Sequence, residues 1–145
     1  MSADALADLF AALEEAVDAS DTLLLLDRSP PGGSRSPSMT VGAEEGEEAS
    51  TLSVTFEPDH GQIVFRGTYW RSGEFTPDMR ERHGLLFRPA ALRLDDEGFR
   101  FSDPRHGAPP DDEGRLERYG TAREAAGALL EILEDFHGKV EERAD

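Results

Sequence analysis

Two arginines at a predicted tight turn, Arg93 and Arg100, are the residues whose type and spacing best suit ligand binding. If residues 95–98 form a four-residue loop, the hairpin register places Arg93 directly opposite Arg100. Like charges in that position repel each other unless water screens them, acids interleave or an anionic group lies between them. Guanidinium groups bind carboxylates and phosphates through paired hydrogen bonds. The pair therefore predicts a face that holds a carboxylate, a phosphate or an acidic peptide. The alternative is a solvated face whose arginines form weak ion pairs with nearby acids.

Arg66 and Trp70 extend this candidate surface. Arg66 lies on the outward face of another predicted hairpin, and it joins Arg93 and Arg100 if the two hairpins are neighbours. Trp70 follows at the end of the same predicted strand. Aromatic and arginine side chains beside a loop are typical of protein-binding surfaces, and equally typical of a sheet edge that packs on a helix. We therefore take Arg66, Trp70, Arg93 and Arg100 as candidate residues for binding a partner or an anion.

Motifs for catalysis, cofactors and metals are absent from the sequence. It contains no Gly-x-Ser-x-Gly, P-loop or Gly-x-Gly-x-x-Gly motif. It has no cysteine, and its four histidines lack the spacing of a metal site. A general acid needs a buried or partnered carboxylate, whereas paired acids such as Asp95 and Asp96 are expected to be solvated. The sequence predicts no cofactor and no metal, and it leaves catalysis as the minority interpretation.

The charge balance is the strongest global feature. The 145 residues include 31 acids and 15 bases, for a net charge of −16, and Lys139 is the single lysine. A high-salt or high-GC host would produce this composition without functional meaning, and a partner with a basic surface is the other explanation. A negative surface repels phosphates, which argues against direct DNA or RNA binding and against anionic membranes.

The acids are unevenly distributed along the chain. Residues 1–59 hold 13 acids and two bases, whereas residues 60–118 hold 11 acids and 10 arginines. A site for an anion therefore belongs in the middle third of the chain.

The elements that would position these residues begin with a hairpin over residues 51–70. Apolar and polar side chains alternate with period two on both sides of residues 58–61, whose sequence Pro-Asp-His-Gly is typical of a turn. Residues 91–102 predict a second hairpin with Leu92, Leu94, Phe99 and Phe101 pointing inward.

Two amphipathic helices are predicted near the ends of the chain. Residues 3–19 carry an apolar stripe at helical spacing, as do residues 121–143. Thr121 and Glu124 have the spacing of a capping box at the start of the second helix. The four leucines at 23–26 predict a short strand in the centre of the sheet, and residues 76–84 predict one or two helical turns.

Residues 28–50 are rich in Pro, Gly and Ser and then become acidic. Such a segment buries too little apolar surface to offset its ordering entropy, so we expect a mobile internal loop. It is either a functional loop or a tolerated surface insertion. The 27 residues before it cannot fold alone, and residues 1–145 are therefore expected to form a single domain.

Together the elements predict an α+β fold. The sheet is antiparallel, is built from two hairpins with about four to six strands, and has the N- and C-terminal helices packed on one face. The element order and acidity resemble those of secretion-chaperone-like domains, small acidic α+β proteins that bind partner segments. The similarity is architectural and transfers no residue.

The sequence favours a non-enzymatic, acidic protein-interaction domain of an adaptor, chaperone-like or regulatory kind. It would bind a protein partner through its sheet face and adjacent loops. The alternatives are an anionic-ligand domain or enzyme that uses Arg66, Arg93 and Arg100, and an acidic mimic of nucleic acid. A homodimer is a further option, and the lack of a signal peptide or apolar spanning segment predicts a cytoplasmic protein.

Overall fold

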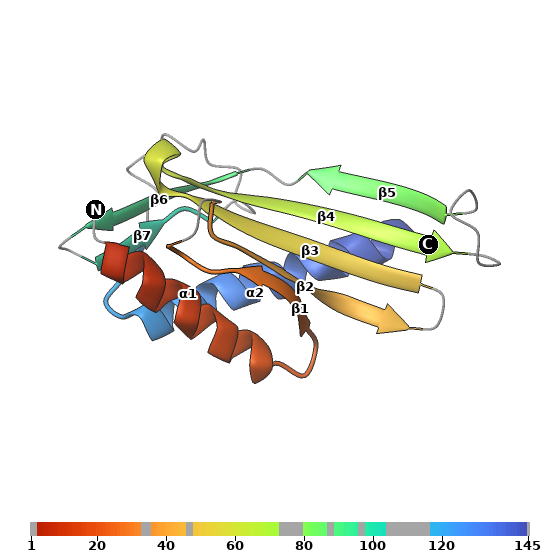
Figure 1. The fold of residues 1–145 in the computed structure, drawn as a ribbon, viewed down its shortest axis with the longest axis horizontal. Helices are drawn as coiled ribbons and strands as arrows, with labels where there is room; N and C mark the ends of the chain where they lie inside the picture. Colours follow the sequence, from red (N-terminus) through yellow and green to blue (C-terminus); the bar gives the residue numbers. More distant parts are fainter. Residues whose placement is uncertain are drawn as a thin grey trace.

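The computed structural model describes residues 3–32, 36–45, 48–72, 80–86, 89–95, 98–103 and 117–144. These residues form two α-helices, eight strands and a short 3₁₀ turn (Figure 1). In chain order the elements are α1 (Ala3–Asp18), β1 (Leu24–Ser29), β2 (Ser38–Glu45), β3 (Glu48–Glu57), the 3₁₀ turn (Pro58–His60), β4 (Gln62–Ser72), β5 (Arg80–Leu86), β6 (Ala90–Asp95), β7 (Gly98–Phe101), β8 (Glu117–Tyr119) and α2 (Ala122–Ala144).

All eight strands belong to one antiparallel sheet. The order is β1-β2-β3-β4-β6-β7-β8, and β5 pairs with β4 beside this path. Every described pair of neighbouring strands is antiparallel, and β5 and β6, which both pair with β4, run in the same direction. The predicted α+β class with an antiparallel sheet is confirmed. The described strands exceed the expected four to six because β2 and β8 form in segments whose composition predicts loops.

The strands β5 and β6 lie end to end along the same side of β4 (Figure 1). Leu86 of β5 pairs with Arg66, and Ala90 of β6 pairs with Ile63. Two residues of β4 separate these pairs, whereas three residues separate Leu86 from Ala90. The register of β6 on β4 is therefore shifted by one residue relative to that of β5. Pro89, which has no N–H to donate, lies in this step. Strand β6 therefore pairs with β4 over only two residues and continues the sheet with β7 and β8.

Both helices cover one face of the sheet, as predicted. Helices α1 and α2 pack against each other, α2 also contacts β3 and β4, and α1 contacts β1 and β6. The two predicted helix stripes are buried, including Leu9, Leu13, Leu129 and Leu133. The inward side chains of the strands complete this core and include Met39, Val41, Leu52, Val54, Phe56, Ile63, Phe65, Leu92, Leu94, Phe99 and Phe101.

Local signals for turns and caps are found where the sequence places them. Gly61 closes the first hairpin with φ of 65°, and Gly98 closes the second with φ of 113°, conformations that side chains rarely adopt. The Thr121 hydroxyl accepts a hydrogen bond from the Glu124 N–H at 3.1 Å, which confirms the N-cap. The Glu124 carboxylate accepts from the N–H of Gly120, one residue before the cap.

Three predictions of local structure are wrong. The leucines at 23–26 lead into β1, which is an edge strand and not a central one, because among the described strands it pairs with β2 alone. Part of the predicted loop over 28–50 is strand β2, whose Met39 and Val41 are buried. Residues 80–84 of the predicted short helix belong to strand β5, while its first residues lie outside the described ones.

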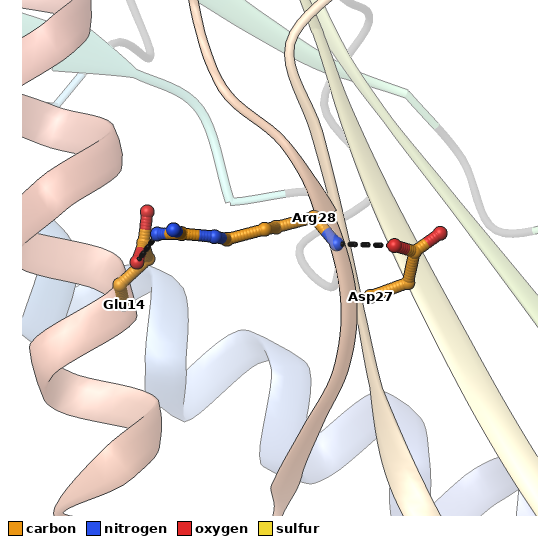
Figure 2. A network of polar contacts seen from close by, with 3 residues as sticks. All are labelled: Glu14, Asp27 and Arg28. Atoms are coloured by element: carbon orange, nitrogen blue, oxygen red, sulfur yellow. Dashed lines mark hydrogen bonds and ion pairs between the residues drawn. The ribbon is translucent and has the colours of Figure 1, made fainter.

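The edge strand β1 is attached to α1 by a charged contact. Figure 2 shows the Arg28 side chain extending from β1 to form an ion pair with Glu14 of α1. The Asp27 carboxylate accepts a hydrogen bond from the Arg28 N–H at 2.8 Å. A bulge between Leu25 and Asp27 interrupts the register with β2. Bulges and charges are common protections of sheet edges. No helix within the described ranges is long and apolar enough to cross a membrane.

Candidate functional site

Three arginines occupy paired positions, side by side, on neighbouring strands. The second hairpin has the predicted register, in which Leu94 pairs with Phe99 and Arg93 with Arg100. Strand β8 then extends the row, because Arg100 also pairs with Arg118. We refer to Arg93, Arg100 and Arg118 as the arginine row. Since neighbouring strands lie about 4.8 Å apart, the row spans about 10 Å across β6, β7 and β8.

Strand alternation decides the face on which the row lies. Leu92, Leu94, Phe99 and Phe101 are buried on the helix side of β6 and β7. The residues between them must project to the opposite face. Arg93 and Arg118 are accordingly exposed, and Arg100, between them, is half-buried. The arginine row therefore belongs to the outer face of the sheet.

Glycine and an aromatic pair hold β8 in place beside β7. A Cβ atom at Gly98 would lie 2.8 Å from the Tyr119 carbonyl oxygen, so only glycine permits this approach. The rings of Phe101 and Tyr119 are stacked with centroids 4.6 Å apart. The Tyr119 hydroxyl donates a hydrogen bond to Glu117 at 2.8 Å. Burial, followed by the effects of Glu117, raises the pKa of Tyr119 above its ordinary value, so the hydroxyl stays a donor.

The arginine row concentrates positive charge in a chain of net charge −16. Each of the three residues also has an interaction within the chain. A guanidinium has five donors in a planar fork, more than one intramolecular contact uses. The row can therefore bind carboxylate or phosphate oxygens while keeping such contacts.

The structure does not bring Arg66 into this row. Arg66 is exposed on β4, where its backbone pairs with Ser53 and Leu86. Because Gln62 pairs with Ala91, Arg93 lies beyond the start of β4, about six residues or ~20 Å along the strand from Arg66. Both side chains are on the outer face, but a single small ligand cannot contact them together.

Trp70 lies farther along β4, where its backbone pairs with Ala49 and Arg82. Its side chain lies outside the described part of the structure. Of the four candidate residues, the fold therefore places Arg93 and Arg100 side by side and puts Arg66 and Trp70 elsewhere along the sheet. The roles of all four in binding stay predictions.

A second polar pair is buried between the sheet and α2. Ser50 Oγ of β3 and His137 Nε2 of α2 lie 2.9 Å apart, and the two residues are 2% and 6% exposed. A serine hydroxyl beside an imidazole resembles a nucleophile paired with its general base. Burial of both residues keeps a substrate from reaching Ser50 Oγ, so in this structure the pair acts as a structural contact between the layers.

Sequence reasoning missed Arg118, Ser50 and His137 as members of these sites. The period-two alternation that revealed the hairpins is too short to see in the three residues of β8. No local pattern in the sequence indicates that Ser50 and His137 are partners, because they lie 87 residues apart. Among the described residues, no group of three His, Asp or Glu side chains is placed to hold a metal ion.

Comparisons with protein-family models, with curated proteins and with solved structures find no match for this chain.

Proposed function

We propose that the chain is a non-enzymatic interaction domain that binds an acidic segment of a partner protein on the outer face of its sheet. The observation that carries this proposal is the arginine row, in which Arg93, Arg100 and Arg118 occupy paired positions on three strands. Aligned guanidinium groups favour an anionic ligand with several carboxylates over a neutral one.

The distribution of charge supports an acidic protein segment as the ligand. The row lies in residues 60–118, where acids and arginines nearly balance, while residues 1–59 carry most of the excess negative charge. A short acidic segment can therefore approach the row without facing the most acidic part of the chain. A long polyanion such as DNA or RNA would extend over that part and be repelled.

A small anion is the second candidate, because the half-buried Arg100 lies between two exposed arginines. Three guanidinium groups at this spacing could surround one phosphate or citrate. A thermal shift of the free protein that saturates with phosphate or citrate, and that the row variant loses, would favour this candidate over a protein segment.

The proposal is tested by capture from the native host at its own ionic strength. Wild type is compared with the triple variant Arg93→Gln, Arg100→Gln and Arg118→Gln, and with Arg123→Gln as the control. Arg123 is an exposed arginine on α2, on the helix side of the sheet. We expect a stoichiometric partner that is retained by Arg123→Gln and lost by the triple variant. Equal capture by all three proteins would refute the assignment.

Two further variants define the extent of the surface. Arg66→Gln and Trp70→Ala change the outlying candidates on β4. If either weakens capture, the partner covers the outer face from β4 to β8. If neither does, the contact is confined to the arginine row.

A further inference from the structure

The arginine row runs across the strands and not along them, and this direction restricts the shape of the ligand. Arg93, Arg100 and Arg118 are each the direct partner of the next in register. A segment that lies parallel to the strands passes over the row once and meets one or two of its arginines. A segment that contacts all three must cross β6, β7 and β8.

We propose that the occupant of the arginine row is an acidic α-helix of a partner protein, lying across the strands with carboxylates at positions i, i+4 and i+7. This inference rests on the proposed function and adds the conformation of the bound segment. One turn of helix advances 5.4 Å, close to the strand spacing of about 4.8 Å. Seven residues advance about 10.5 Å, compared with about 10 Å for the whole row.

An extended segment fits the same row less well. Side chains on one face of a strand are two residues apart, or about 6.7 Å, so the third carboxylate lies about 13 Å from the first. Such a segment matches two arginines and overshoots the third. The helix therefore gains one more charge-assisted contact per ligand than an extended segment of the same composition.

The layered fold argues against a second copy of this chain as the occupant. Helix α2 has exposed acids at Glu124, Glu131 and Asp135 that could occupy the row of another molecule. The helices and the row lie on opposite faces of the sheet, so that contact would be head-to-tail. One row and one helix would stay free at the ends of such an assembly, which would grow into a filament unless the rotation between copies closed it into a ring. A helix from a different protein would occupy the row in a complex of defined size.

The test uses the full chain and three labelled peptides of equal length and net charge, each with three glutamates. The first is an alanine-based helix with glutamates at i, i+4 and i+7. The second is an equally helical peptide whose glutamates are spread around the helix. The third contains prolines between the glutamates and is extended. Their affinities are measured by fluorescence anisotropy at low ionic strength, with circular dichroism to verify peptide helicity.

We expect the striped helix to bind about three- to tenfold more tightly than either other peptide, as one additional ion pair would produce. Arg100→Gln should remove most of this preference and Arg123→Gln should leave it unchanged. Tighter binding of the extended peptide would overturn the helical inference while leaving the proposed function in place. The inference also fails if none of the peptides binds; the capture experiment then decides the proposed function separately. Sedimentation that shows self-association lost on Arg100→Gln would assign the row to a second copy and overturn the choice of partner.

Discussion

Ser50 Oγ and His137 Nε2 form a buried hydrogen bond of 2.9 Å that joins the start of β3 to the second half of α2. Both residues are almost fully buried, at 2% and 6% exposure. The surrounding contacts between the layers are apolar, as in the edge-to-face pair of Phe65 and Phe136 with centroids 5.3 Å apart. A directional bond among them favours one register of the helix on the sheet.

Removal of either partner of this bond should lower the free energy of unfolding. Removal of both partners should lower it by less than the sum of the two single effects. Ser50→Ala takes the hydroxyl from the buried imidazole and should lower the free energy of unfolding by about 1–3 kcal/mol. His137→Phe should have a similar effect, because it leaves the hydroxyl facing a ring without a polar atom. The double variant replaces both partners with apolar groups, so we expect positive coupling of about 1 kcal/mol or more in a double-mutant cycle.

Urea unfolding followed by circular dichroism measures these differences. Ser53→Ala is the control, because Ser53 lies on the outer side of the same strand and its hydroxyl donates a long 3.4 Å hydrogen bond to the Arg66 carbonyl oxygen. It should change stability by less than about 0.5 kcal/mol. Strictly additive effects of Ser50→Ala and His137→Phe would show that the two side chains do not interact.

A second prediction concerns Gly42 of β2, which lies against the backbone of Ser50. A Cβ atom on Gly42 would overlap the Ser50 carbonyl oxygen, and backbone cannot move aside as a flexible side chain can. Gly42→Ala should therefore destabilise the protein by about 2 kcal/mol or more. Gly127→Ala is the matched control, because a Cβ atom there has open space on α2, and it should stabilise the helix by about 0.5–1 kcal/mol. A Gly42→Ala protein with an unchanged thermal midpoint would contradict the close approach of β2 and β3.

The parts of the fold that could be predicted are those with a local signal. Helices α1 and α2 have long apolar stripes, and the two hairpins have alternation on both sides of a turn that contains Gly61 or Gly98. Strand β2 has the same kind of alternation at Met39 and Val41, but prolines, glycines and acids on either side conceal it. Its strand state comes from pairing with β1 and β3, which is a tertiary effect.

The candidate site shows the same division. The Arg93 and Arg100 pair follows from the turn length alone, because residues of one hairpin have a fixed register. Arg118 joins them only because β8 returns to pair with β7 after a long connection. Arg66 is separated from them because β6 pairs with β4 over just two residues at the start of β4, next to the one-residue step at Pro89. Pairings between distant segments carry no periodic signature in the sequence.

The net charge of −16 predicts that salt stabilises the fold. Screening weakens the mutual repulsion of the acids, and it weakens ion pairs such as Arg28 with Glu14 as well. Exposed pairs of this kind contribute about 1 kcal/mol or less each, so the repulsion should dominate. We expect the thermal midpoint to rise steadily from low salt to molar KCl. Equal midpoints across that range would show that the acids are too far apart to repel appreciably.

The raised pKa of Tyr119 predicts that the protein loses stability at alkaline pH. Its pKa in the folded protein is raised, first by burial and then by Glu117, whereas the unfolded chain ionises near the ordinary value of 10.0. Below that value the hydroxyl is neutral in both states and has no effect on the pH dependence. Above it, the unfolded chain loses a proton that the folded protein keeps, so stability falls as pH rises, by at most about 1.4 kcal/mol per pH unit and by less where solvent screens the ring.

Tyr119→Phe separates this effect from the titration of other groups, because it keeps a ring to stack on Phe101 and removes the ionisable hydroxyl. Urea midpoints measured from pH 8 to 11 should fall more steeply above pH 10 for wild type than for Tyr119→Phe, and the two curves should run parallel below pH 9. Parallel curves over the whole range would mean that Tyr119 ionises as readily in the folded protein as in the unfolded chain. The packing of β8 against α2, and with it the position of Arg118, would then be looser than the stacked ring implies.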